Sequence, residues 1–268
     1  MRQPSIDLRP SRLDIEALLK GSSLPAYVGL WSTHLKSERF FSAAKRPLTF
    51  LLMPNGTMNI KRILKPEDFR IAAPVDCGST VQVRVITTRD GSLETPESIE
   101  TLPVAKGEIQ AAPERGINKI CMIDRIMGTG ELGAAFVKGF NISEGCIGTT
   151  ANVFNQNIVL VGASDEDMAT AANETIKMGG GFIALRKGKV VASLPTPLNG
   201  LATDMTFDEV FRAQRRLLQT WRDMGCTLQT PQMNLEFVSL VTIPYYRICT
   251  KGLAYMTEDR FELAELVV

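Results

Sequence analysis

Side chains that could catalyse a reaction or hold a metal are few in this chain. The 268 residues contain one histidine, His34, and five widely spaced cysteines without a C-x-x-C pair. Metal sites that activate water usually need several His or Cys ligands, and a nucleophilic cysteine needs a base beside it. We therefore assign no catalytic residue and no metal ligand, and we predict that the cysteines are buried, reduced thiols.

An amide-rich stretch offers binding chemistry. Residues 149–157 read TTANVFNQN and separate two apolar segments. The side chains of Asn155, Gln156 and Asn157 could contact the edge of a small ligand, because each amide pairs hydrogen-bond donors with an acceptor. These residue types also favour turns, so a plain loop is the alternative. None of them is an effective acid or base near neutral pH, so we expect binding rather than catalysis.

A second candidate site is the acidic start of a helix. Ser164 occupies an N-cap position, and Asp165 begins a run of three acids. Residues 164–167 could bind a metal or hydrogen-bond a polar ligand at the carboxyl end of a strand. Capping of the helix is the simpler interpretation, since acids in a first turn are favoured by the helix dipole. We favour capping.

Three glycines match a nucleotide-binding string. Gly128, Gly130 and Gly133 give G-x-G-x-x-G, which in dinucleotide-binding proteins opens a helix and is followed by an acid about 20 residues on. Here residues 134–140 resemble a strand, and no such acid follows. We interpret the string as a turn between strands and predict neither NAD nor flavin.

The elements that position these residues form a mixed α/β pattern. Residues 158–161 predict a buried strand, Ser164 starts a helix that ends at the glycines 179–181, and residues 182–185 predict a return strand. The two strands of this βαβ unit should be parallel. Further predicted strands are 81–87, 117–123, 134–140, 146–151, 190–194, 235–240, 245–249 and 261–268.

A second helix is predicted after the capping box formed by Thr206 and Glu209. Its apolar residues should face the core; they are Phe207, Val210, Phe211, Leu217, Leu218 and Trp221. The fold class is therefore mixed α+β, largely a β-sheet system with a βαβ unit and at least two packed helices.

Composition limits the partners and the location. The net charge of +1 provides no basic field for nucleic acid, and no apolar run approaches the roughly 20 residues of a membrane span. No secretory signal is visible, so we expect a cytoplasmic protein, and we expect a homo-oligomer. Residues 1–56 read as an extension of unclear fold, and residues 57–268 as the main domain.

Several motifs resemble those of one family. They are FVKGF at 136–140, NIVLVG at 157–162, SDEDM at 164–168, MGGG at 178–181 and KGKVVA at 187–192. In this order and spacing they resemble the C-terminal domain of bacterial adenine deaminases. The resemblance runs from about residue 57 to the end, and residues 1–54 have no counterpart.

The resemblance implies a reaction of adenine with water that yields hypoxanthine and ammonia. It also implies a preceding amidohydrolase barrel whose histidines hold a divalent metal, Mn or Fe, that activates water. One histidine cannot build that barrel, so we expect the barrel and its metal to be absent from this chain. Family histidines also correspond to Ile126, Val153 and Gln156 here, which removes their acid–base chemistry.

Three hypotheses follow. The chain is an adenine-deaminase-like C-terminal domain that does not turn over adenine by itself. Alternatively, it is an accessory subunit that completes a separately encoded amidohydrolase chain. The third hypothesis is that it binds a purine or another small polar ligand through residues 149–157 and 164–167.

Overall fold

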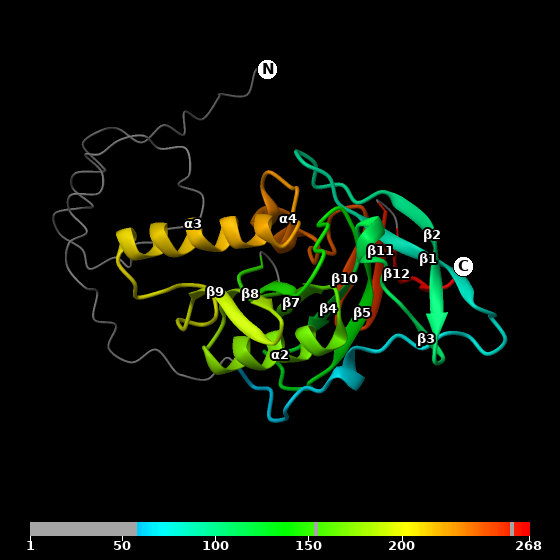
Figure 1. Cartoon of the computed structure of the whole chain (residues 1–268), viewed down its shortest axis with the longest axis horizontal. Coiled ribbons are helices and arrows are strands. Elements are labelled where there is room, and N and C mark those ends of the chain that lie inside the picture. The colour runs from blue at the N-terminus through cyan, green and yellow to red at the C-terminus, as the bar shows by residue number, and fades with distance from the viewer. Residues whose placement is uncertain (1–57, 153–154, 258–259) are drawn as a thin grey trace, which may run out of the picture. The chain divides into compact units, whose positions relative to one another are not determined.

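A nine-stranded sheet dominates the computed structural model, which describes residues 58–152, 155–257 and 260–268. The expectations for residues 1–57, among them the extension and His34, lie outside the described residues, as does Val153. The strand order is β3-β2-β1-β5-β4-β7-β6-β8-β9 (Figure 1). The bounds are β1 Thr80–Thr87, β2 Glu97–Ala105, β3 Glu108–Ile109, β4 Ile117–Ile123, β5 Leu132–Lys138, β6 Cys146–Thr149, β7 Ile158–Gly162, β8 Gly181–Arg186 and β9 Lys189–Pro195.

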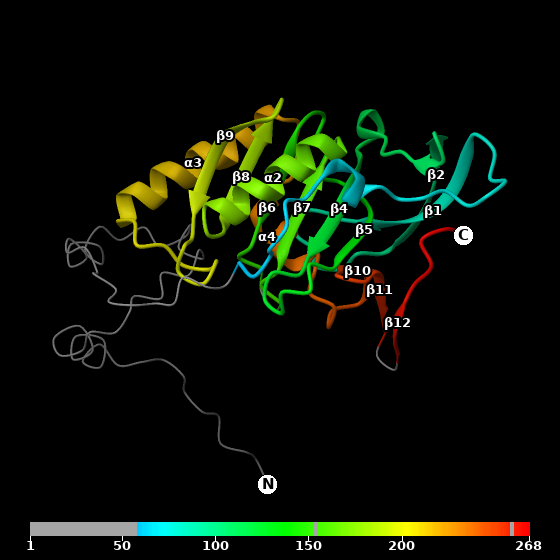
Figure 2. The same cartoon turned by 90° about the horizontal axis from the view of Figure 1, so that it is seen from below.

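Helices cover both faces of this sheet. Helix α2 (Asp165–Lys177) lies on one face, and α3 (Phe207–Asp223) and α4 (Pro231–Phe237) lie on the other (Figures 1 and 2). Every residue of the central strands β4, β6 and β7 is buried as a result. The continuous apolar run of β7 follows from this burial, because a strand covered on both faces has no polar side. The buried polar side chains of β4, Asn118 and Lys119, instead have hydrogen-bond or ion-pair partners. The predicted mixed α+β class is confirmed.

The predicted βαβ unit is present as β7, α2 and β8. Strand β6 pairs antiparallel with both β7 and β8, so β7 and β8 are parallel to each other with β6 between them. The predicted parallel direction is therefore confirmed. Strand β6 was predicted at residues 146–151, but its position between β7 and β8 was not, because the side-chain period of a strand carries no information about its neighbours.

Helix α3 departs from its prediction at its first turns. The capping box of Thr206 and Glu209 is present, and Leu217 and Trp221 are buried. Phe211, however, is 50% exposed. These first turns extend beyond the edge strand β9 in Figure 2, so no strand of the sheet lies under them. An apolar helix face is therefore not sufficient to bury a residue.

The prediction of a strand at residues 235–240 is wrong. Helix α4 occupies Pro231–Phe237 instead, with Pro231 at its first position and Asn234 and Leu235 among its buried residues. A short apolar run fits a buried helix face as well as a strand, and proline at the start of a helix costs no hydrogen bond. The proline therefore resolves the ambiguity.

The chain ends in a small three-stranded sheet that packs against β4 and β5. Its strands are β10 (Tyr245–Cys249), β11 (Gly252–Met256) and β12 (Phe261–Leu263). Strand β10 matches its prediction, whereas the predicted strand 261–268 continues only to Leu263. Strands β2, β3 and β11 were missed. In β2 only Leu102 is fully buried, so its apolar pattern is weak.

The glycine string is a turn, as predicted. Gly128 and Gly130 have φ of 70° and 66°, conformations that favour glycine. Gly133 lies in β5 at a close approach, because a Cβ there would come within 2.1 Å of the carbonyl oxygen of Cys249. Each glycine therefore has a conformational or packing role.

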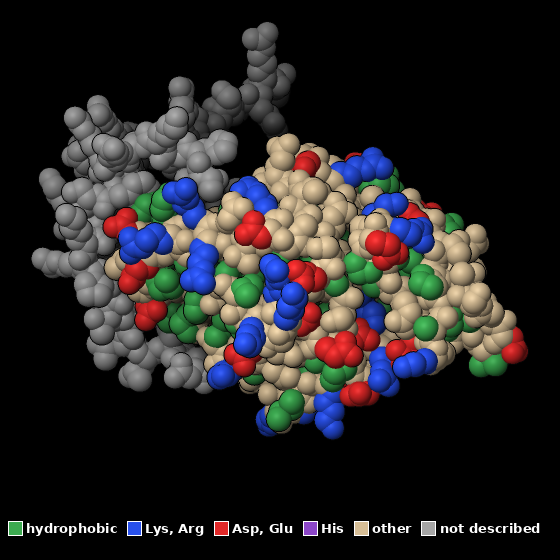
Figure 3. Space-filling view, in the orientation of Figure 1, with side chains coloured by type: hydrophobic (Ala, Val, Ile, Leu, Met, Phe, Trp, Pro, Cys, Tyr) green, Lys and Arg blue, Asp and Glu red, His purple; other side chains and the backbone are tan. Residues whose placement is uncertain are grey.

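Two further sequence expectations concern thiols and surface. Cys121, Cys146 and Cys226 are buried, while Cys77 and Cys249 are partly exposed, and all five are free. The face drawn in Figure 3 mixes basic and acidic side chains. In the described part of the chain, no helix is long and apolar enough to cross a membrane.

Candidate functional site

A polar cluster surrounds the buried side chain of Arg125 at one end of β7. Arg125 is 0% exposed, and its Nε donates to the carbonyl oxygen of Gln156 at 2.5 Å. Its Nη2 donates to the carbonyl oxygen of Asn199 at 2.9 Å. Burial lowers the pKa of Arg125 to about 10, so the side chain stays cationic at neutral pH. One guanidinium thus joins residues 149–157, here called the amide loop, to the loop after β9.

The backbone around this guanidinium is unusual. Gln156 and Asn199, whose carbonyls accept its hydrogen bonds, both have φ of 58°, a left-handed conformation that is uncommon outside glycine. Gly200 packs against Arg125, and a Cβ there would come within 2.6 Å of Nη2. The hydroxyl of Thr150 donates to the Gly200 carbonyl oxygen at 2.6 Å. Tertiary contacts therefore set the shapes of both loops.

Most amides of the amide loop are already used within the fold. Asn155 Nδ2 donates to the carbonyl oxygen of Ser239 at 3.1 Å, and its Oδ1 accepts from the Asn157 amide nitrogen at 3.0 Å. Asn157 Oδ1 accepts from the Arg125 amide nitrogen at 3.1 Å. The side chain of Gln156 makes no hydrogen bond in the described structure. Of the three predicted binding amides, Gln156 is thus the one with both donor and acceptor available.

The loop after β4 is braced beside this cluster by Asp124. Its carboxylate accepts hydrogen bonds from the amide nitrogens of Ile126, Met127 and Thr129 and from the Thr129 hydroxyl. Burial by itself would raise the pKa of Asp124, but these hydrogen bonds outweigh it and lower the pKa. Asn59 adds a hydrogen bond of 2.7 Å to the Ile126 carbonyl oxygen. Ile126 is therefore held next to Arg125.

Two of the three positions that the resemblance relates to family histidines adjoin Arg125. Ile126 follows Arg125 in the chain, and Gln156 accepts a hydrogen bond from Arg125 through its carbonyl. Val153 lies outside the described residues. The two described positions present an aliphatic side chain and a neutral amide, and neither exchanges protons near neutral pH. The cluster can hold or orient a ligand, but it has no acid–base pair at these positions.

The second candidate site lies at the other end of β7. Ser164 Oγ accepts from the Asp167 amide nitrogen at 3.2 Å, so the favoured capping role is confirmed. Asp165 pairs with buried Lys119, with 2.5 Å between Oδ1 and Nζ. Burial raises the pKa of Asp165 despite this partner. At about 3.3 Å per residue, the five residues of β7 span about 13 Å between the two candidate groups. The groups lie at opposite ends of the strand and do not face one common small ligand.

The donor set of the described residues does not fit a catalytic metal. The described residues contain no group of three or more His, Cys, Asp or Glu side chains that could hold an ion. The single histidine of the sequence, His34, lies outside the described residues. A water-activating metal site needs three or more protein ligands around an open position. These residues therefore supply no metal centre of the kind that the resemblance implies.

Sequence reasoning missed the residues that organise the cluster. They are Arg125, Thr150 and Asn199, which act through hydrogen bonds between segments remote in sequence. The one available signal for a buried polar cluster was Arg125, an arginine just after an apolar strand, since a buried charge needs dedicated partners. The partners cannot be recognised from the sequence, because they are backbone carbonyl groups.

Fold and site together define a mixed α+β domain whose polar cluster is arranged for binding and positioning. Residues 92–260, more than half of the chain, match the adenine deaminase C-terminal domain family. This chain belongs to that family.

The similarity to curated relatives covers only part of each relative. The adenine deaminase of Moorella thermoacetica is 34% identical over 211 residues, which cover 79% of this chain and 35% of the relative. The adenine deaminase of Clostridium botulinum strain Langeland is 33% identical, with 80% and 35% covered. That of Brucella abortus strain 2308 is 35% identical, with 68% and 31% covered. The chain thus spans about a third of the length of these relatives.

Proposed function

We propose that this chain acts as the C-terminal domain of an adenine deaminase and does not turn over adenine by itself. The family match over residues 92–260 supports the link to adenine, water, hypoxanthine and ammonia. The claim that the chain is inactive by itself rests on its shortage of metal ligands. One histidine in 268 residues cannot supply the ligands of a water-activating metal. On this proposal, a histidine-rich amidohydrolase segment supplies the catalytic metal.

An activity assay tests this proposal directly. The purified chain is incubated with adenine and Mn²⁺ or Fe²⁺, and hypoxanthine is measured by chromatography against a metal-only control. We expect no hypoxanthine above the control. Robust turnover by the chain alone would contradict the proposal, because it would require a catalytic centre that the donor set does not provide.

The chain's contribution is then to complete an amidohydrolase in trans. The Arg125 cluster supports this role, since both Ile126 and Gln156, which the resemblance relates to family histidines, adjoin Arg125 in the chain or through a hydrogen bond. A separately encoded amidohydrolase chain should co-purify with this chain, and its deaminase rate should rise on mixing. Absence of association at micromolar concentration, together with an unchanged rate, would count against this role.

A purine-binding role is the second candidate, and the available amide of Gln156 favours it. A thermal-shift series across adenine, hypoxanthine and guanine tests it, since a ligand at 100 times its Kd adds roughly 2.7 kcal/mol to stability. Gln156→Ala should lose that stabilisation. Gln229→Ala, which removes an exposed amide elsewhere, should keep it. If no purine stabilises the chain, this candidate fails while the accessory role stands.

A further inference from the structure

A carboxyl group without a partner lies in the last turn of α4, close to the amide loop. Glu236 is partly buried, and its side chain forms no hydrogen bond or ion pair in the described part of the chain. Removal of a carboxylate from water is costly unless it is paired, so an unpaired one tends to keep its proton. Glu236 has no part in the function proposed above.

The same face of α4 carries a second polar group without a partner. Gln232 precedes Glu236 by four residues, so the two side chains are neighbours on the helix surface. Gln232 Oε1 accepts from Gln214 Nε2 of α3 at 3.0 Å, while its own Nε2 is buried without an acceptor. This neighbouring donor does not bond to Glu236. An ionised Glu236 therefore has no compensating donor among the described residues.

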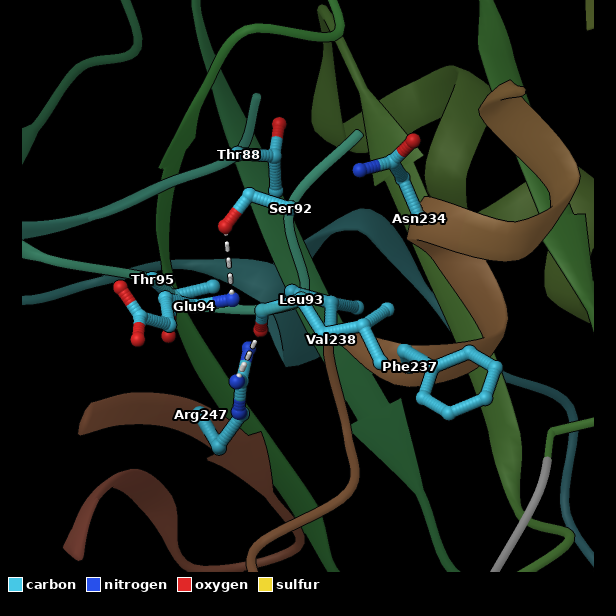
Figure 4. A pocket seen from close by; sticks show the side chains of 9 residues that line it. All are labelled: Thr88, Ser92, Leu93, Glu94, Thr95, Asn234, Phe237, Val238 and Arg247. Carbon is cyan, nitrogen blue, oxygen red and sulfur yellow. Dashed lines mark hydrogen bonds between the residues drawn. The ribbon is translucent and has the colours of Figure 1, made fainter. Parts of the chain in front are cut away.

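The cations near α4 lie on its far side. Asn234 and Val238 are each two residues from Glu236, which is about 200° around a helix. Figure 4 shows both residues at a small hollow that Arg247 also lines. The backbone of Arg89 is on this side as well, because its carbonyl oxygen accepts from Asn234. Neither cation is on the face that carries Glu236.

The elements near Glu236 supply no ionised group. The amide loop, residues 149–157, contains no titratable side chain, and α3 bonds to α4 through the neutral amide of Gln214. Strand β6 also packs against α4; burial holds the pKa of its Cys146 thiol well above the ordinary value, so the thiol stays neutral. Burial alone raises the pKa of Glu236 to about 7.

The last turn of α4 also holds the amide loop in place. Asn155 Nδ2 donates to the carbonyl oxygen of Ser239 at 3.1 Å, and the Ser239 hydroxyl donates to the carbonyl oxygen of Glu236 at 3.5 Å. Asn155 Oδ1 accepts from the Asn157 amide nitrogen at 3.0 Å. One asparagine thus joins the loop to the turn that carries Glu236, and movement of this turn acts on the loop.

We propose that Glu236 is a proton-operated latch on the amide loop. With its proton, the carboxyl group stays packed beside α4, and the Ser239 carbonyl holds Asn155. Without its proton, the carboxylate turns toward water, the last turn of α4 opens, and the hydrogen bond between Asn155 and Ser239 breaks. The loop that carries the Gln156 side chain is therefore fixed at acid pH and released at higher pH.

The direction of this switch follows from the raised pKa. The pKa of Glu236 is about 7 while the latch is closed, and it returns to the lower value of a hydrated glutamate when the latch opens. The open form releases its proton first, so a rise in pH favours opening until the closed form ionises as well. The opening equilibrium should rise roughly 30- to 100-fold between pH 5 and pH 8.

Hydrogen exchange in the amide loop of the whole chain tests the proposal. The reporter is the backbone N–H of Asn157, which bonds to the side chain of Asn155, and its protection is compared at pH 5 and pH 8 after correction for intrinsic exchange rates. The wild-type chain should lose protection by roughly 30- to 100-fold at pH 8. Glu236→Gln, which keeps the size of the side chain but cannot ionise, should retain its protection. The matched control Glu114→Gln removes an exposed carboxylate elsewhere and should behave as the wild type.

Two further measurements do not depend on how well Glu236→Gln folds. Asn155→Ala removes the other half of the latch, so exchange in its loop should be fast and should lose the pH dependence. In the wild-type chain, the ¹³C resonance of one glutamate carboxyl should titrate near pH 7. Absence of such a resonance, pH-dependent protection that survives Asn155→Ala, or the wild-type pH dependence in folded Glu236→Gln would each overturn the proposal.

Discussion

Each end of β7 buries a cation that comes from β4 or from two residues beyond its end, but the partners of the two cations differ. At one end Lys119 pairs with the carboxylate of Asp165 at 2.5 Å. At the other end Arg125 donates to the backbone carbonyls of Gln156 and Asn199. The first arrangement joins two opposite charges. The second joins one permanent charge to neutral dipoles.

This difference assigns different roles to the two ends. The Lys119–Asp165 pair ties the first turn of α2 to the sheet, and Ser164 caps the same turn, so this end is an anchor. The Arg125 end holds two loops in left-handed conformations and leaves the Gln156 side chain without a partner. Backbone held in a sparsely populated conformation is a mark of functional sites. The Arg125 end is therefore the better candidate for ligand contact.

Loss of the ion pair should have the largest effect. Lys119→Met leaves the partly buried Asp165 carboxylate, which is 18% exposed, without its partner. This should cost about 3–4 kcal/mol of unfolding free energy, the lower part of the range for buried ion pairs. Burial already raises the pKa of Asp165 in the folded state, so the unfolded chain releases this proton first and stability falls as pH rises through the folded pKa. Urea unfolding should therefore show a larger loss at pH 8 than at pH 4.

Two controls accompany this variant. Lys177→Met removes a lysine that is 76% exposed and should change stability by less than about 0.5 kcal/mol. The double variant Lys119→Met/Asp165→Leu should recover much of the loss, because no charge remains buried. A loss of equal size at both pH values would show that Lys119 acts through packing alone.

Removal of the guanidinium should have the second largest effect. Arg125→Met leaves the carbonyl oxygens of Gln156 and Asn199 without donors, which should cost about 2–4 kcal/mol. This loss should be the same at pH 4 and pH 8, since carbonyl oxygens do not titrate, and that contrast with Lys119→Met sharpens the distinction between the two ends. Arg260→Met, at a side chain that is 63% exposed, is the control. A strong pH dependence for Arg125→Met would break the comparison.

The helix cap should contribute less. Ser164→Ala removes the acceptor for the Asp167 amide nitrogen, which should lower the unfolding free energy by about 1 kcal/mol. Ser164→Asp keeps an acceptor and should restore most of that stability. If both substitutions cost the same, the cap does not anchor α2.

The smallest expected effect is a gain. Gln156 has φ of 58°, so Gln156→Gly should relieve the left-handed strain and raise the unfolding free energy by up to about 1 kcal/mol. The control is Gln229→Gly. Gln229 does not have a positive φ, so this substitution should leave stability unchanged or lower it. A destabilising Gln156→Gly would show that the glutamine side chain supports the loop.

Short sequence patterns correctly predicted the elements that are set by interactions between residues close in sequence. The seven residues of β4 matched their predicted range, and the caps of α2 and α3 stand at Ser164 and Thr206 as predicted. A cap is a hydrogen bond within one turn, and a buried strand is mostly apolar, so both are visible in a short window. The strand predicted at 235–240 failed because a short run of six mostly apolar residues fits a strand and a buried helix face equally well.

The candidate site was predicted less completely. The sequence indicated an amide loop at residues 149–157, and the structure places such a loop between β6 and β7. It did not indicate that Asn155 and Asn157 are used within the fold, nor that Arg125 organises the loop. Arg125 and Asn199 are 74 residues apart, and no period or motif links residues at such a separation.

By itself, the sequence determined the mixed class of the fold, the caps of its helices, the family and the shortage of metal ligands. These depend on residue identity and on spacing within a few turns. Only the tertiary structure decided the insertion of β6 between β7 and β8, the overhang of α3 beyond β9 and the separation of the two candidate groups by the length of β7. Each of these depends on which segments become neighbours, and burial over the whole chain selects those neighbours.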